Sequence, residues 1–305
     1  MFVLGLIMTK GKIISGCLAP HPPHLVYSAN PSQNEPRSSG AGAWDTLHQG
    51  YEKLRNSLCE KDFDVLIVHT PHWKTRIGHH LLAVPHFSGL SVDPIFPNLF
   101  RFKFDLNVDV ELSEMIKVCG EEYGLEMSLM RNPEFRVDYG TITSCHLAWP
   151  QWNKPIVCIS SGRAYFDFSN EVGDKEMLAL GLATRRAIEK TGKRAVLLAS
   201  TSLSHRHFTV EPNDPEDPDF ESIYNSNQAA WDQHVVDLMG KGQCQQLLDE
   251  MPDFIDQANA ECKDGGLTWL LGALNIPTYS AKVYGYGSVI GTGNAIVEWE
   301  EELQS

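Results

Sequence analysis

Histidines gather directly after three apolar runs in this sequence, and each run has the length and composition of a buried strand. They are His21 and His24 after Ile13–Leu18, His69 and His72 after Val65–Val68, and His205 and His207 after Arg194–Ser200. Imidazoles bind transition metals and exchange protons near neutral pH. Parallel strands that end at one edge of a sheet would bring such groups together. Each histidine also has a simpler interpretation, as a loop or packing residue.

Two imidazoles and one carboxylate on one face of a metal ion form the ligand set of non-haem Fe(II) enzymes that use oxygen. The remaining coordination positions stay open for substrate and O2. The same three ligands also hold catalytic zinc, which generates hydroxide in hydrolases. Because the residues lie far apart in the sequence, their spacing alone leaves both chemistries open, along with a non-catalytic subunit.

Several other catalytic motifs are missing from the sequence. It contains no phosphate-binding G-x-x-x-x-G-K-[ST] loop, no G-x-S-x-G elbow and no H-E-x-x-H helix. The glycines of GYGSVIG (Gly285–Gly291) imitate a dinucleotide-binding pattern, but no helix or acidic ribose ligand follows at the right distance. We interpret this segment as a twisted hairpin.

The composition is that of a large globular α/β protein. The chain has 305 residues, of which 42% are hydrophobic and 21% charged, with a formal net charge of -14. That negative charge disfavours nucleic acid and anionic membranes as partners, and no apolar run approaches the roughly 20 residues of a membrane span. MFVLGLI at the start lacks the basic region and cleavage site of a signal peptide. We expect residues 1–10 to be an extension and 11–305 to form one catalytic domain.

The seven cysteines indicate a reducing, cytoplasmic setting. Their number is odd, they are scattered and no C-x-x-C pair occurs, so neither a disulfide framework nor a thiolate zinc site is indicated.

Hydrophobic periodicity predicts a single α/β domain with a central mixed sheet flanked by helices. The expected helices cover 44–58, 111–123, 174–190, 222–238 and 254–274. Strands are expected over 13–18, 65–68, 154–160 and 194–200, with a strand pair within 278–300 at the sheet edge. The stretch that contains His79, His80 and His86 is predicted to be irregular. Polar loops are expected over 28–43 and 211–220.

Four segments of the sequence resemble one known family, the class III extradiol dioxygenases. They are APHPPH (19–24), PHW (71–73), LSH (203–205) and AECKDGGLTWLLGAL (260–274). The family has the fold of the protocatechuate 4,5-dioxygenase catalytic subunit, and the resemblance extends over nearly the whole chain.

The resemblance implies a role for individual residues. His21, His72 and Glu261 correspond to the three metal ligands, and His205 corresponds to the acid–base histidine. Many relatives have Asp-His-Gly where this chain has Asp-Tyr-Gly, so Tyr139 would present a phenol to the substrate or to oxygen, or else be a half-buried packing residue. His24 is expected behind the metal ligands.

We interpret the other histidines conservatively. His69 is expected in strand packing, His207 is the alternate to His205, and His48, His146 and His234 are expected to be structural or surface residues.

The function implied by this resemblance is Fe(II)-dependent cleavage of an aromatic ring by O2. APHPPHLVY followed by NPSQNEPR (30–37) is similar to members that act on o-aminophenols, so a 2-aminophenol opened to a 2-aminomuconate semialdehyde is the expected reaction. Such members pair with a homologous α subunit that lacks a full metal site, which implies an α2β2 hetero-oligomer. A catechol- or protocatechuate-type dioxygenase and a zinc hydrolase are the alternatives.

Overall fold

A mixed eight-stranded sheet forms the centre of the computed structural model, which describes residues 10–28, 43–93, 101–161, 170–206 and 223–300. The strand order is β6-β3-β7-β2-β8-β1-β10-β9. The strands are β1 (Lys12–Leu18), β2 (Val65–Lys74), β3 (His79–Leu82), β6 (Met127–Met130), β7 (Ile156–Ser161), β8 (Arg194–Ala199), β9 (Lys282–Val289) and β10 (Thr292–Glu300). The predicted mixed sheet is therefore confirmed.

The four central strands β7, β2, β8 and β1 run parallel, so their carboxyl ends meet at one edge. Leu18 of β1 and His69 of β2 both lie beside Ala199 of β8. His21, His72 and Ser200–Ser202 therefore follow within a few residues of one level of the sheet, although β2 itself continues to Lys74. This register explains why residues distant in sequence meet there.

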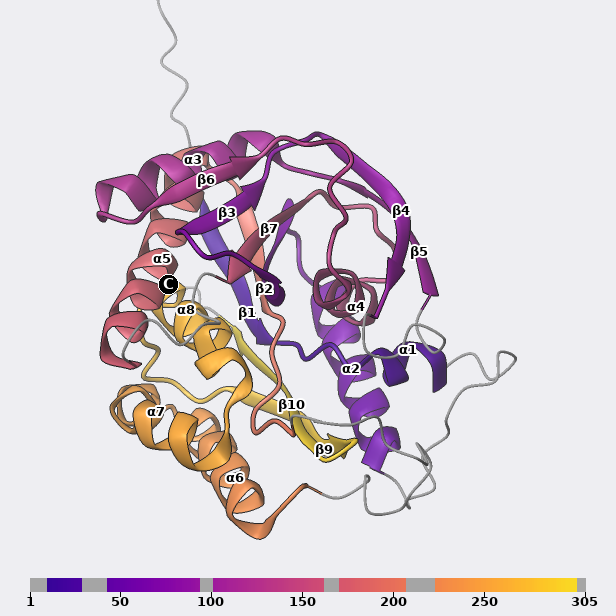
Figure 1. Cartoon of the computed structure of the whole chain (residues 1–305), viewed down its shortest axis with the longest axis vertical. Helices are drawn as coiled ribbons and strands as arrows, with labels where there is room; N and C mark the ends of the chain where they lie inside the picture. The colour runs from indigo at the N-terminus through magenta and orange to yellow at the C-terminus, as the bar shows by residue number, and fades with distance from the viewer. Residues whose placement is uncertain (1–9, 29–42, 94–100, 162–169, 207–222, 301–305) are drawn as a thin grey trace, which may run out of the picture.

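Helices cover both faces of the sheet, as Figure 1 shows. One face carries α1 (Pro23–Ser28), α2 (Ala43–Cys59), α4 (Tyr139–Ala148) and the hairpin of β4 (His86–Val92) and β5 (Arg101–Asn107). The other carries α3 (Val110–Glu122), α5 (Asn170–Thr191), α6 (Ser226–Gly240), α7 (Cys244–Ala258) and α8 (Gly265–Ala273). Helices such as α2 form because their apolar residues recur on one side, whereas every residue of α8 is buried. In α2, Leu47, Leu54 and Leu58 are fully buried against the sheet.

The structure corrects three predictions of local structure. The expected helix over 254–274 is broken, because α7 ends at Ala258 and α8 begins only at Gly265. The stretch predicted to be irregular forms β3 and β4. β3 pairs with β6 and β7, which are distant in sequence, and β4 pairs with β5 in a hairpin. These pairings form the strands without a local alternation of apolar and polar residues. β2 continues beyond the predicted strand to Lys74, so that His72 lies within it instead of in a turn.

Other predictions agree with the structure. β9 and β10 form the predicted antiparallel pair, and β9 is the edge strand. All seven cysteines are free thiols. None of the helices within the described ranges is long and apolar enough to cross a membrane. His207, the predicted loop 211–220 and most of the predicted extension and first loop lie outside the described residues.

Candidate metal centre and active-site pocket

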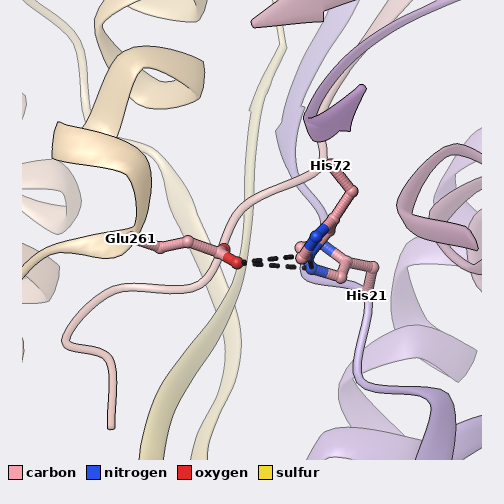
Figure 2. Close-up of side chains that lie close together, drawn as sticks. All are labelled: His21, His72 and Glu261. Carbon is pink, nitrogen blue, oxygen red and sulfur yellow. Dashed lines mark hydrogen bonds and ion pairs between the residues drawn. The ribbon is translucent and has the colours of Figure 1, made fainter. Parts of the chain in front are cut away.

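His21, His72 and Glu261 converge at the carboxyl edge of the sheet. One ligand atom from each residue lies within 4.8 Å of the others. The two Nε2 atoms are 2.7 Å apart, and Oε1 of Glu261 is 3.4 Å from Nε2 of His21 and 3.5 Å from Nε2 of His72. Figure 2 shows the carboxylate facing the two imidazoles from the opposite side. Ligand atoms about 2.1 Å from a shared ion and at right angles would be about 3 Å apart, so these three residues fit one metal.

The hydrogen bonds of His21 determine which ring nitrogen is available to a metal. Oγ of Ser200 lies 3.0 Å from Nδ1 of His21 and donates its proton to the carbonyl oxygen of Gly140 at 2.9 Å. A hydroxyl has a single proton, so Ser200 accepts from His21, and Nδ1 of His21 carries the hydrogen. The lone pair is then on Nε2, which points at His72 and Glu261. This is the orientation that metal-binding histidines require.

The carboxylate of Glu261 is held by one oxygen and presents the other. Oε2 accepts hydrogen bonds from the backbone NH of Ser202 at 2.6 Å, from its hydroxyl at 2.9 Å and from the hydroxyl of Thr201 at 3.2 Å. Oε1 is left to face the imidazoles. The arrangement therefore predisposes Glu261 to bind a metal through a single oxygen.

Long-range contacts and an unusual backbone place Glu261. Its NH donates to the carbonyl oxygen of Leu203, and Ser204 and Ala260 form a β-bridge. The three residues that follow, Cys262, Lys263 and Asp264, all have left-handed backbone angles with φ between 46° and 54°. Such angles cost roughly 1–3 kcal/mol each in non-glycine residues and concentrate at functional sites.

Glu261 and the two imidazoles shift one another's pKa values. Burial by itself raises the pKa of Glu261, but the His21 and His72 imidazoles beside it hold that pKa well below its usual range. Burial opposes the charged form of His21 as well, yet the Glu261 carboxylate raises the pKa of this histidine overall. For His72, burial and repulsion from His21 outweigh Glu261, and the pKa is lowered. Glu261 therefore stays negatively charged, and this charge favours the binding of a cation at the cluster.

His205 lies beside these three candidate ligand residues but is not part of their group. Its Nε2 is 3.6 Å from Oε1 of Glu261, and its side chain is 25% exposed. Both backbone groups of His205 are held by Asn259, whose carbonyl accepts its NH at 3.2 Å and whose side-chain amide donates to its carbonyl at 2.9 Å. The backbone of His205 is therefore fixed where the residue lines the pocket, and its imidazole is partly exposed.

Tyr139 is the first residue of α4, and its ring stands over His72. The ring centroids are 4.3 Å apart, and the hydroxyl lies 2.8 Å from Nε2 of His72. Asp138 caps the helix by accepting from the NH of Thr141 at 3.0 Å. Burial and the nearby carboxylates of Asp93 and Glu261 raise the pKa of Tyr139 well above its usual value, so the phenol keeps its proton.

Five further histidines that the sequence analysis singled out lie outside this cluster. His24 lines the pocket beside Trp44, and burial lowers its pKa to about 4. His69 stacks on Trp269, away from the ligand atoms, and burial lowers its pKa to about 3. His146 contacts Phe102 and Trp152, and His234 contacts Glu250, while His48 is half-buried on α2. None of these last three lines the pocket described next.

A pocket of about 250 Å³ opens beside the candidate ligand residues. Its walls are His21, Pro22, Pro23, His24, Asp93, Tyr139, Ser202, His205, Arg206, Glu261, Val289, Ile290, Thr292 and Asn294. Sequence reasoning missed Asp93, Arg206 and Asn294, which no motif marks. The run of small hydroxyl residues Ser200–Ser202 directly after β8 was a usable signal, because such residues support ligands at strand ends.

Comparison with protein families gives one match over most of the chain. Residues 15–297 match the family described as "Catalytic LigB subunit of aromatic ring-opening dioxygenase". All of the residues in the metal cluster and the pocket fall inside this range.

Three curated proteins are similar to this chain. The 2-aminophenol 1,6-dioxygenase beta subunit of a Pseudomonas species is 52% identical over 292 residues, which cover 96% of this chain and 95% of that protein. The 3,4-dihydroxyphenylacetate 2,3-dioxygenase of Escherichia coli is 24% identical over 90% of this chain and 94% of that protein. The 2-aminophenol 1,6-dioxygenase alpha subunit of a Pseudomonas species is 23% identical over 84% of this chain and 91% of that protein.

A solved structure supports the fold alone. The uncharacterized protein JW3007 of Escherichia coli K12 superposes with a TM-score of 0.60 at 13% identity, covering 93% of this chain and 99% of that one.

Proposed function

The chain belongs to the family of the catalytic LigB subunit of aromatic ring-opening dioxygenases, and from this membership we propose that it opens the ring of 2-aminophenol, or of a substituted 2-aminophenol, with O2. The product is a 2-aminomuconate 6-semialdehyde, which contains both oxygen atoms. The 52% identity to a 2-aminophenol 1,6-dioxygenase beta subunit supports this substrate over catechol or protocatechuate. We assign the reaction to the cytoplasm, in line with its free thiols.

The convergence of His21, His72 and Glu261 is the observation that carries the proposal. Two neutral imidazole nitrogens and one carboxylate oxygen form the ligand set of non-haem Fe(II) oxygenases, and we propose Fe(II) as the metal. The iron would hold the vicinal hydroxyl and amino groups of the substrate and supply electrons from the ring to O2. The pocket beside the cluster is large enough for one aromatic ring.

His205 is proposed as the acid–base group of the reaction. It sits at the pocket wall 3.6 Å from Glu261, and an imidazole exchanges protons near neutral pH. Its Nε2 would accept the proton of the substrate hydroxyl and return it at a later step. Because Asn259 holds its backbone on both sides, the ring is pre-positioned for this exchange.

Tyr139 is proposed as a hydrogen-bond donor to the substrate or to oxygen. The phenol lines the pocket and keeps its proton, so it can donate but does not act as a base. Its ring also packs against Val26 and Phe102, so the packing role and the donor role coexist. His24 is proposed to form part of the pocket wall behind the ligands.

The chain is proposed to work in a hetero-oligomer. The beta-subunit relative has a named alpha counterpart, and the alpha protein also resembles this chain at 23% identity. An α2β2 assembly with a homologous α subunit that lacks a complete metal site accounts for this pairing. Copurification of a tagged chain with a homologous partner of similar size tests it, and a fully active monomer or homodimer would contradict it.

Anaerobic reconstitution with Fe(II) or Zn(II), followed by oxygen-uptake assays, tests the reaction. We expect O2 uptake only with Fe(II), and a higher kcat/KM for 2-aminophenol than for catechol or protocatechuate. Hydrolase activity with zinc and no oxygen uptake with iron would refute the proposal.

A further inference from the structure

Arg206 provides a positive charge at the pocket wall that the proposed reaction does not use. It follows His205 directly, and it is the one arginine or lysine among the described residues that line the pocket. The chain as a whole has a net charge of -14, and Asp93 and Glu261 place two carboxylates in the same walls. The guanidinium attracts an anionic group that enters the pocket, whereas these two carboxylates repel it, so Arg206 is the one group in the described walls that favours an anion.

Neighbouring residues position the Arg206 side chain. Its backbone NH donates to the hydroxyl of Thr292 at 3.2 Å. Its guanidinium carbon lies 4.8 Å from the centre of the Tyr224 ring, within the range of a cation–π contact. A Cβ at Gly291 would come within 2.9 Å of Cδ of Arg206, and Gly291 has a φ of +76°. The glycine therefore leaves the space in which the arginine lies.

Arg206 and the turn beside it belong to the same wall of the pocket. Arg206 lines it together with Ile290 and Thr292, the two residues on either side of Gly291. Tyr224 is tied to the same turn, since its NH donates to the carbonyl oxygen of Gly291 at 3.2 Å. The turn between β9 and β10 thus holds Arg206 and Tyr224 together.

We propose that Arg206 forms a subsite for a carboxylate on the aromatic ring of the substrate, so that the preferred substrates include aminophenols that carry a ring carboxylate. This inference rests on the proposed function, because it assumes that an aromatic ring occupies the pocket. A guanidinium binds a carboxylate through two parallel hydrogen bonds, whereas a lysine at the same place offers only a point charge. The 250 Å³ pocket has room for a ring that bears such a substituent.

Anaerobic binding titrations on the iron-loaded enzyme with its partner subunit test the subsite. The ligands are 4-amino-3-hydroxybenzoate and 3-amino-4-hydroxybenzoate, each compared with its neutral carboxamide, and unsubstituted 2-aminophenol. We expect at least one acid to bind wild type at least tenfold more tightly than its carboxamide. Arg206→Met should weaken the binding of that acid about 10- to 100-fold. It should change the affinities for the carboxamides and for 2-aminophenol less than about threefold.

Further variants separate charge, shape and general stability. Arg206→Lys should recover only part of the affinity, and Tyr224→Leu should weaken acid binding about two- to fivefold. Arg186→Met removes an exposed charge that pairs with Glu122 on the outside of the protein. This control should leave the affinities for all of these ligands unchanged.

Two outcomes would overturn the subsite: neither acid is preferred over its carboxamide by wild type, or Arg206→Met weakens acids and carboxamides equally. Parallel kcat/KM measurements keep the two proposals apart. If wild type binds the acid selectively but opens no aminophenol ring, the proposed reaction fails while the subsite stands.

Discussion

Ser200→Ala is expected to weaken metal binding although Ser200 touches no metal. In the wild-type protein the hydroxyl of this fully buried residue accepts a hydrogen bond from Nδ1 of His21 and donates one to the carbonyl of Gly140. Alanine removes the only acceptor that the structure shows for Nδ1. The imidazole then loses the contact that keeps its Nε2 lone pair directed at Glu261 and His72.

The size of the effect follows from these contacts. A buried donor without an acceptor costs about 1–3 kcal/mol, and His21 is only 6% exposed. Since 1.4 kcal/mol corresponds to a factor of ten, the Fe(II) dissociation constant should rise roughly 5- to 150-fold. This agrees with the 10- to 100-fold losses typical when the partner of a metal-binding histidine is removed.

Anaerobic competition between the protein and an Fe(II) chelator measures this constant directly. Ser160→Ala is the matched control, because Ser160 is also fully buried near the end of a parallel strand, β7, but bonds to Thr75 and to the NH of His80. The control should lose stability to a similar degree and keep its iron affinity.

Two results would refute this reasoning. Wild-type iron affinity in a correctly folded Ser200→Ala variant would show that the hydroxyl does not set the tautomer of His21. An equal loss of iron in Ser160→Ala would show that any buried serine at this sheet edge has the same effect.

Three further predictions concern the ligands, the acid–base group and a buried histidine. Glu261→Gln keeps the size of the side chain but removes its charge, and metal analysis should find most of the iron gone while circular dichroism stays unchanged. His205→Phe should leave iron content and anaerobic substrate binding largely intact while single-turnover rates fall by roughly 10²–10⁴, and loss of iron would instead make His205 a ligand. Burial lowers the pKa of His69 to about 3, so the unfolded chain takes up a proton near pH 6.5 that the folded protein does not, and stability falls as the pH drops below about 6.5. Urea unfolding of the metal-free protein between pH 7.5 and pH 5 should show wild type losing about 2 kcal/mol more than His69→Phe, and equal losses would contradict this assignment.

Elements whose apolar pattern is local could be predicted from the amino-acid sequence. The 3- and 4-residue steps of α2 and the continuous apolar runs of β1, β2 and β8 are properties of short segments, and the structure confirms each element. Short motifs around His21, His72, His205 and Glu261 were enough to indicate the family, which the match over residues 15–297 confirms.

Strands and helix breaks that depend on contacts with distant residues could not be predicted from the sequence. β3 has only four residues and is held between β6 and β7, so its own pattern gives no strand signal. The break between α7 and α8 depends on the left-handed residues 262–264, which are stabilised by the contacts of Glu261 with Leu203 and Ser202. Propensity alone extends the helix through this point, because those contacts form only after the chain has folded.

Tertiary structure also decided how the site works. Motif residues identify possible ligands, but the hydrogen bond that leaves the Nε2 lone pair of His21 free comes from Ser200, which is 179 positions away. The donors that turn one oxygen of Glu261 toward the imidazoles lie about 60 positions from it. Arg206 and Asp93 reach the pocket from different elements, and neither carries a recognisable motif. Orientation and charge within a site depend on distances between atoms remote in sequence, and only the folded chain fixes those distances.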